Sequence, residues 1–210
     1  QIDRAQPDLT PGEKYLRTLE HLGSGSLISD VSQYTLNNLQ KSYAQLDQGT
    51  VEQIVDILLR SDRKYIAGFR GTACCAQYMA SKLLFLTPHV VPILHADATA
   101  VENLLDITER DCLFLYSFPR YSEIARPLME IARESGAKVI LMTDRRTSPL
   151  ANKADVVVTA QVDGLGFTNS YVAPLSLSEV ILLSVSGRKD VTDSKRFNRI
   201  DSVMEREKLY

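Results

Sequence analysis

The sequence predicts an α/β fold, a doubly wound parallel sheet of five strands with flanking helices, and three observations support this prediction. Short apolar runs without polar alternation recur along the chain, as in strands that are buried on both faces of a parallel sheet. Helical patterns separate these runs, and a polar segment follows the carboxyl end of most of them. Residues 111–150 contain one complete unit of this kind, with a strand, a loop, a helix, a second strand and a second loop.

The composition is that of a globular protein with a hydrophobic core. Hydrophobic residues make up 44% of the 210 residues, and no run approaches the roughly 20 apolar residues that a membrane helix needs. The net charge of −2 provides no broad basic field for nucleic-acid phosphates. The cysteines Cys74, Cys75 and Cys112 are odd in number and lack metal-ligand spacing, so we expect a reducing cytoplasm and no metal site.

The first part of the chain precedes the sheet. Residues 1–25 are polar and contain several prolines and glycines, and we interpret them as a linker with at most a short helical pattern over 14–22. Two helices are then expected, over residues 27–46 and 51–60. Thr50 directly precedes the second of these helices and is a candidate for its N-cap.

Five apolar runs are the expected strands. They cover residues 64–67, 90–94, 112–116, 138–142 and 155–160. Pro92 lies inside the second run and has no amide hydrogen to donate, so that strand is expected at an edge of the sheet. A helix between parallel strands requires a right-handed crossover, which sends the carboxyl ends of the strands to one edge.

Helical patterns lie between and after these strands. They cover residues 73–86, 99–105, the segment between Ser122 and Gly136, and 174–186. Ser122 can cap the third of these helices, and Ser148 can cap a turn that has Pro149 at its first helical position. The tail 188–210 alternates charges and is expected to form one amphipathic helix with Phe197, Ile200, Val203 and Met204 on one side.

The loop after the first expected strand is a candidate anion site formed by Gly68, Arg70, Gly71 and Thr72. Its glycines allow a sharp turn and a close backbone approach to a ligand, and the loop leads into a helix N-terminus whose N–H groups attract anions. The pattern differs from a dinucleotide-binding GxGxxG because no third glycine follows. The alternative is a tight turn with a solvated Arg70.

The loop after the third expected strand repeats this chemistry with Ser117, Arg120 and Ser122. Both loops follow parallel strands and therefore belong to the same edge of the sheet, where open α/β sheets bind ligands. A guanidinium group suits bidentate binding of phosphate or carboxylate. The alternatives are that Ser117 satisfies its own backbone and that Ser122 only caps its helix. We predict an anionic ligand between the two loops.

The sequence gives no indication of catalysis. It contains no GxSxG motif, and none of the three histidines, His21, His89 and His95, lies near a carboxylate at a useful spacing. Glu102 and Glu123 are the carboxylates nearest to the predicted site, and we expect both to be solvated. No catalytic residue and no cofactor are therefore predicted.

Three segments carry a resemblance to a known family. These are GFRGTA at 68–73, YSFPRYSE at 116–123 and GAKVILMTDRRTSPLANKADVVV at 136–158. Together with the preceding helical region, they resemble a SIS (sugar isomerase) domain. The chain is most similar to the ligand-binding domain of bacterial RpiR-family transcription regulators, from about residue 27 to its C-terminus.

The resemblance implies roles for individual residues. In SIS domains the hydroxyl groups and backbone of the first two loops hold the phosphate of a phosphosugar, which carries over to Thr72, Ser117 and Ser122. The sequence departs from the usual pattern at Arg70, where many members have a small residue. It also has Pro119 and Arg120 where sugar isomerases typically have Ser-Gly. Both departures add positive charge, which suits an anionic ligand.

The resemblance also implies partners and a domain organisation. RpiR regulators carry a helix-turn-helix DNA-binding domain before the SIS domain. Because Gln1 is not an initiator methionine, we expect residues 1–25 to be the remnant of the linker and 26–210 to be the sensing domain. The implied partners are a small anionic metabolite such as a phosphosugar, operator DNA through that other domain, and further copies in a homodimer or tetramer. The alternatives are a SIS aldose–ketose phosphate isomerase and an interaction module without a small ligand.

Overall fold

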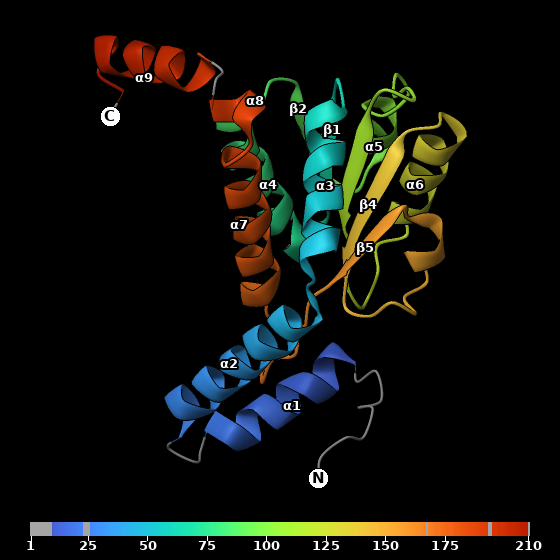
Figure 1. Cartoon of the computed structure of the whole chain (residues 1–210). Coiled ribbons are helices and arrows are strands. Elements are labelled where there is room, and N and C mark those ends of the chain that lie inside the picture. The colour runs from blue at the N-terminus through green and yellow to red at the C-terminus, as the bar shows by residue number, and fades with distance from the viewer. Residues whose placement is uncertain (1–9, 23–25, 167, 193–194, 210) are drawn as a thin grey trace.

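The computed structural model describes residues 10–22, 26–166, 168–192 and 195–209, which form a parallel sheet with helices on both faces (Figure 1). The strands are β1 (Lys64–Gly68), β2 (Val90–Ile93), β3 (Cys112–Tyr116), β4 (Lys138–Thr143) and β5 (Val156–Thr159). The helices before the third strand are α1 (Pro11–Leu22), α2 (Leu27–Gln45), α3 (Gln48–Arg60), η1 (Arg70–Thr72), α4 (Ala73–Leu86) and α5 (Ala98–Glu102). The later helices are α6 (Ala125–Glu134), η2 (Ala151–Lys153), α7 (Val172–Ser186), α8 (Lys189–Thr192) and α9 (Arg196–Arg206).

The sheet has the strand order β2-β1-β3-β4-β5, and every neighbouring pair is parallel. The predicted fold class and the five strand positions are confirmed. Pro92 lies in β2 at the edge of the sheet, as its missing amide hydrogen required. From β1 the chain crosses to β2 on one side, while β3 is followed by β4 on the other. The order therefore reverses between β1 and β3, and such a switch point is where open α/β sheets bind ligands.

Each face of the sheet has its own hydrophobic core. Ile66, Phe114 and Ile140 point to the face that α3, α4 and α7 cover. Leu113 and Leu141 belong to the opposite core, which α5 and α6 complete. Alternate residues of one strand thus enter different cores, as expected for a doubly wound sheet that is buried on both faces.

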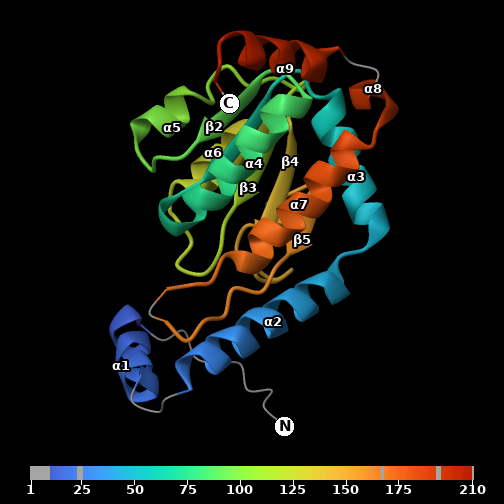
Figure 2. The same cartoon turned by 90° about the vertical axis from the view of Figure 1, so that its left-hand side faces the viewer.

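The N-terminal helices lie apart from these two layers. Figures 1 and 2 show α1 and α2 beyond the carboxyl edge of the sheet, and α9 at the opposite edge. Helix α1 is longer than the short helical pattern predicted for this segment. Thr10 and Glu13 explain its start, because the Thr10 backbone N–H donates to Glu13 Oε2 over 2.7 Å and Pro11 occupies the first helical position. The predicted linker also includes residues 1–9 and 23–25, which lie outside the described residues.

Three predicted helix boundaries are wrong. Helix α3 begins at Gln48 because Asp47, and not Thr50, is its N-cap, and Asp47 Oδ1 accepts the Thr50 N–H over 2.8 Å. Helix α5 ends at Glu102, since turns occupy the following residues up to 106. The tail is divided into α8 and α9, so the single helix predicted over 188–210 is also wrong.

The connection between β4 and β5 differs from the predicted helical turn. Ser148 does not start a helix with Pro149, because only a short segment joins the two strands and it forms the single turn η2. Instead, the Ser148 carbonyl accepts the N–H of Ala151 over 3.0 Å. The Ser148 hydroxyl is buried and finds no hydrogen-bond partner within the described part of the chain.

We expect the core to lose stability at high pH. Burial raises the pKa of the Cys112 thiol to about 11, from 9.0, and burial also raises the pKa of Cys75 and of Tyr116. Between pH 9 and 11 the unfolded chain therefore releases protons that the folded chain keeps, which favours unfolding. Cys112 alone should lower the free energy of unfolding by about 2 kcal/mol between pH 8 and 11.

Urea unfolding at these pH values measures this effect. Burial lowers the pKa of Lys64, whose ammonium donates to Thr87 Oγ1 over 3.0 Å, and this works in the opposite direction near pH 10. The variant Cys112→Ala is therefore the matched comparison, since it retains Lys64. Its free energy of unfolding should fall less steeply between pH 8 and 11 than that of the parent chain. If the free energy of unfolding fell equally steeply with pH in both proteins, the loss of stability could not be assigned to Cys112.

Candidate functional site

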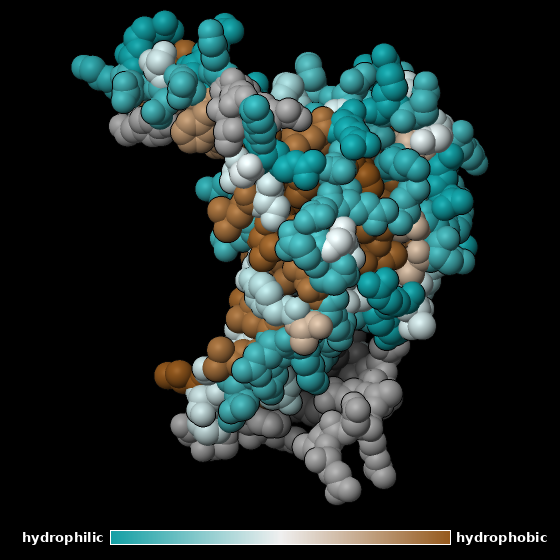
Figure 3. All heavy atoms as spheres, viewed as in Figure 1, coloured by the Kyte–Doolittle hydropathy of each residue, from teal (hydrophilic) through white to brown (hydrophobic). Residues whose placement is uncertain are grey.

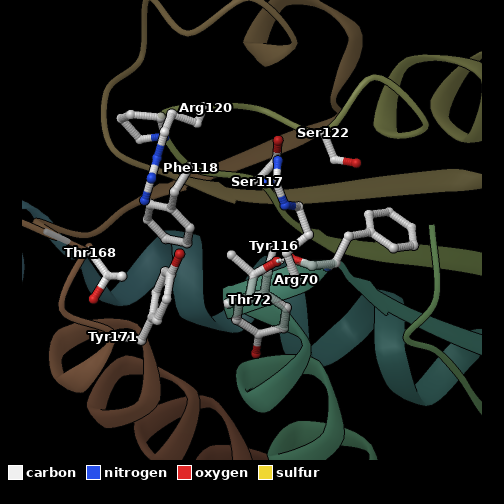
Figure 4. Close-up of a pocket in the computed structure, with 12 residues that line it drawn as sticks. Arg70, Thr72, Tyr116, Ser117, Phe118, Arg120, Ser122, Thr168 and Tyr171 are labelled. Atoms are coloured by element: carbon white, nitrogen blue, oxygen red, sulfur yellow. Dashed lines mark hydrogen bonds between the residues drawn. The ribbon is translucent and has the colours of Figure 1, made fainter. Parts of the chain in front are cut away.

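The loops after β1 and β3 form a cavity at the switch point of the sheet. The two strands are neighbours, but α4 and α6 cover opposite faces, so their preceding loops diverge and leave space between them. The cavity has a volume of about 230 Å³ (Figure 4). Its lining residues are Phe69, Arg70, Gly71, Thr72, Tyr116, Ser117, Phe118, Pro119, Arg120, Ser122, Thr168 and Tyr171. All of the predicted site residues except Gly68 belong to this set.

The first loop is a tight turn that leads into α4. The Thr72 hydroxyl accepts the backbone N–H of Phe69 over 2.8 Å and donates to the Phe69 carbonyl over 2.9 Å. A Cβ atom on Gly68 would lie 2.5 Å from the Thr72 carbonyl oxygen, so only glycine allows this close approach. Arg70 adopts a left-handed conformation with φ of 56°. The Thr72 side chain and Gly68 thus hold the loop in shape, while Arg70 and Gly71 face the cavity.

The second loop contributes hydroxyl groups and a second arginine. Ser117 is 5% exposed, and its Oγ is buried without a hydrogen-bond partner within the described residues. Arg120 is also left-handed, with φ of 68°. Tyr121 fixes the loop to the end of β4 because its hydroxyl donates to Asp144 Oδ1 over 2.7 Å. The unsatisfied Ser117 hydroxyl marks a place where a polar ligand would restore a missing hydrogen bond.

Ser122 does not cap α6, which corrects the sequence prediction. The helix begins at Ala125 with Ile124 as its N-cap, and the Ala125 N–H donates to the Ser122 carbonyl over 3.0 Å. Ser122 lines the cavity instead. Pro127 is the third residue of the helix, where backbone N–H groups have no partner in the helix, so it costs no hydrogen bond there.

A third segment closes the cavity, and the sequence analysis did not identify it. Thr168 and Tyr171 come from the loop that joins β5 to α7. The Tyr171 ring packs on Gly71, where a Cβ atom would lie 2.7 Å from Tyr171 Cε2. It also meets the Phe118 ring edge-on, with 6.0 Å between centroids. One feature of the sequence pointed to this loop: it follows a predicted parallel strand, so it begins at the same edge of the sheet as the loops after β1 and β3.

The cavity has a positive electrostatic character. Arg70 and Arg120 are exposed, and neither forms an ion pair or a hydrogen bond with another described residue. The described lining residues contain no carboxylate and no imidazole. Burial raises the pKa of Tyr171, so its phenol stays protonated near neutral pH. These features favour an anion that is held by guanidinium and hydroxyl groups.

The other candidate residues lie elsewhere. Glu102 and Glu123 are exposed and do not line the cavity. His95 lines a more open hollow together with Arg70 and Cys74, and His89 is exposed. The side chain of His21 lies outside the described part of the structure.

The β5–α7 loop also connects the cavity to the N-terminal helices. Asn38 of α2 donates from Nδ2 to the Asp163 carbonyl over 2.6 Å, and Thr18 of α1 donates to the Leu165 carbonyl over 2.6 Å. Ser42 Oγ accepts the backbone N–H of Gln161 over 2.8 Å. A change in the position of this loop would therefore reach α1 and α2 through direct hydrogen bonds.

The family model of the SIS domain matches residues 57–184 of the chain. The chain belongs to the SIS-domain family. The matched region contains the whole sheet and all three loops that line the cavity. The comparison with curated proteins found no match.

Solved structures support the same fold. The sugar isomerase domain of an RpiR transcription factor from Sphaerobacter thermophilus has a TM-score of 0.80 at 22% identity, covering 86% of this chain and 99% of that one. The Vibrio vulnificus NanR protein, solved with ManNAc-6P, has a TM-score of 0.72 at 16% identity, covering 89% of this chain and 71% of that one. The MJ1247 protein of Methanococcus jannaschii has a TM-score of 0.64 at 14% identity, covering 83% of this chain and 96% of that one. A 3-hexulose-6-phosphate isomerase function was inferred for MJ1247 from its structure.

Two features are absent from the described residues. No helix among them has the length and apolar character needed to cross a membrane. No group of three or more His, Cys, Asp or Glu side chains in the same residues could hold a metal ion.

Proposed function

We propose that this chain is the effector-sensing domain of an RpiR-type transcription regulator and binds a small anionic metabolite of the phosphosugar class. The observation that carries the proposal is the cavity between the first two loops. It combines two arginines without an ionic partner among the described residues with a buried, unsatisfied Ser117 hydroxyl. The likeness to an RpiR transcription factor and to NanR with ManNAc-6P supports this class of ligand.

A SIS isomerase is the second candidate, and the likeness to MJ1247 favours it. Aldose–ketose isomerisation moves a proton between sugar carbons and needs a base within hydrogen-bond reach. The described residues that line the cavity supply only hydroxyl, phenol and guanidinium groups for this role. Tyr171 is a poor base because its raised pKa keeps it protonated. Binding without turnover therefore accounts better for this set of residues.

The proposed regulator also needs a route from the ligand to the DNA-binding domain. A helix-turn-helix domain joined before residue 10 would be followed directly by α1 and α2. These helices hydrogen-bond to the β5–α7 loop, whose Thr168 and Tyr171 line the cavity. A ligand that prefers one position of this loop would shift the equilibrium between two arrangements of α1 and α2. This supports control of operator binding by the metabolite.

We expect the chain to form a homodimer or tetramer at micromolar concentration. Figure 3 shows apolar side chains on the face formed by α2 and α7. Exposed apolar residues of α2, α7 and α9 include Ile28 at 88%, Tyr43, Leu183 at 71% and Phe197. An apolar surface of this kind is typical of an interface with another protein copy. Sedimentation equilibrium measures the assembly, and a monomer throughout this concentration range would contradict the expectation.

A thermal-shift screen tests the proposed function. Pentose, hexose and N-acetylhexosamine phosphates are compared with the same sugars without phosphate. At least one phosphorylated sugar should raise the melting temperature, and its unphosphorylated counterpart should not. The stabilising compound is then incubated with the protein and analysed by ³¹P NMR, where it should remain unchanged. Conversion to an isomer would contradict the sensor and support the second candidate.

A further inference from the structure

We propose that the ligand carries two anionic groups, with a phosphate at the end of the cavity near Arg70 and Ser117 and a carboxylate at the end near Arg120 and Tyr171. The ligand class is thus a phosphorylated sugar acid. This inference rests on the proposed function, because it concerns the same cavity. It adds a second recognition element that a simple phosphosugar would leave unused.

The two arginines occupy different parts of the cavity. Figure 4 shows Arg70 close to Ser117 and Thr72, whereas Arg120 extends on the side of Phe118, Thr168 and Tyr171. They belong to separate loops, which follow β1 and β3. A single phosphate at the Arg70 end would therefore leave the Arg120 charge without a partner.

The backbone of both arginines supports a functional role. Arg70 and Arg120 have positive φ values of 56° and 68°, in the left-handed region that non-glycine residues rarely adopt. Such conformations persist where the surrounding structure enforces them, and they cluster at ligand sites. Only four non-glycine residues among the described ones have positive φ, and two of them are the arginines of this cavity. The strained conformation occurs at the one arginine of each loop.

The surroundings of Arg120 suit a carboxylate. Its positive charge acts on Tyr171, where it opposes the effect of burial on the phenol pKa. Tyr171 remains protonated near neutral pH and can donate a hydrogen bond beside the guanidinium group. A planar guanidinium group binds a carboxylate through two parallel hydrogen bonds. Arg120 and Tyr171 together thus offer three donors for two carboxylate oxygens.

The surroundings of Arg70 suit a phosphate. The Ser117 hydroxyl is buried, unpartnered within the described residues and part of the cavity lining. Ser122 also lines the cavity and is not used as a helix cap. A phosphate has enough oxygen acceptors to serve a guanidinium group and both hydroxyls at once, whereas a carboxylate has only two oxygens. The donors at the Arg70 end therefore suit a phosphate, and those at the Arg120 end suit a carboxylate.

Two matched compounds test the inference by isothermal titration calorimetry. 6-Phosphogluconate and glucitol 6-phosphate have the same carbon chain and phosphate, but carbon 1 is a carboxylate in the first and an alcohol in the second. We expect 6-phosphogluconate to bind about tenfold more tightly, because charge-assisted hydrogen bonds are roughly twice as strong as neutral ones and a tenfold gain corresponds to about 1.4 kcal/mol. Gluconate, which lacks the phosphate, should bind more weakly than either.

Variants of Arg120 assign the preference to one end of the cavity. In Arg120→Gln, 6-phosphogluconate and glucitol 6-phosphate should bind with nearly equal affinity, because the carboxylate of 6-phosphogluconate loses its guanidinium partner. Arg120→Lys retains the charge and should keep part of the preference. Thermal melting without ligand verifies that both variants fold.

The outcomes separate the inference from the proposed function. Equal binding of the two phosphates by the parent chain would overturn the inference and leave the phosphosugar sensor intact. A preference for 6-phosphogluconate that persists in Arg120→Gln would also overturn it, because the carboxylate would then bind elsewhere. Failure of every phosphorylated compound, here and in the wider screen, would overturn both proposals.

Discussion

Replacing Arg70 with glutamine should weaken phosphosugar binding by about 10- to 100-fold, since a hydrogen bond to a charged group contributes roughly 1.5–3 kcal/mol. Arg70 lines the cavity beside Ser117 and has no ionic partner among the described residues, so its loss should affect the ligand more than the fold. Ser117→Ala should also weaken binding, and by a smaller factor. Titration calorimetry with the phosphosugar that stabilises the parent chain measures both effects.

The control for Arg70→Gln is Arg199→Gln, which makes the same charge change on α9 at the opposite edge of the sheet. Arg199 is exposed, and its replacement should leave the affinity unchanged. A similar loss of affinity in both variants would mean that overall charge, and not the cavity, determines binding. Unchanged affinity in Arg70→Gln would remove Arg70 from the site.

Gly68→Ala should lower the free energy of unfolding by about 1–3 kcal/mol, the usual cost of forcing extra atoms into a packed region. The added Cβ atom would lie 2.5 Å from the Thr72 carbonyl oxygen and 3.0 Å from the Ala76 Cβ atom. Both contacts are with atoms that cannot rotate away, so β1 and α4 would have to separate. The loop between them would move as well, and phosphosugar binding should fall.

Gly12→Ala is the matched control for this substitution. A Cβ atom at Gly12 would meet nothing within 4 Å, and the residue lies in the first turn of α1. Alanine favours helix formation over glycine, so this variant should unfold at the same urea concentration as the parent chain or a slightly higher one. If Gly68→Ala behaved like Gly12→Ala, the close packing of the first loop would be refuted.

The sequence predicted the sheet well because the signal for each strand is local. Each apolar run had to be buried on both faces, and a parallel sheet is the arrangement that provides this for several short runs. Helix starts were less predictable, since neighbouring polar residues compete for the cap. Asp47 caps α3 in place of Thr50. At α6 no side chain caps the helix, because the apolar Ile124 occupies the N-cap position and Ser122 lines the cavity.

The candidate site was predictable only where it follows local patterns. The two glycine- and serine-containing loops could be identified because each directly follows a predicted strand. Thr168 and Tyr171 could not, because the cavity brings them together with a first loop about a hundred residues earlier in the sequence, where Tyr171 packs on Gly71. The role of Thr72 was also not foreseen, since its hydroxyl bonds to the Phe69 backbone within a turn whose geometry the sequence does not reveal.

A crystal structure of the chain with the phosphosugar that stabilises it most tests the central claim directly. We expect the phosphate between the loops that follow β1 and β3, with Ser117 Oγ donating to one phosphate oxygen and the Arg70 guanidinium group to another. The Ser117 hydroxyl would then have the partner it lacks among the described residues. A phosphate bound elsewhere, such as in the hollow beside Cys74 and His95, with the space between the loops empty, would contradict the account.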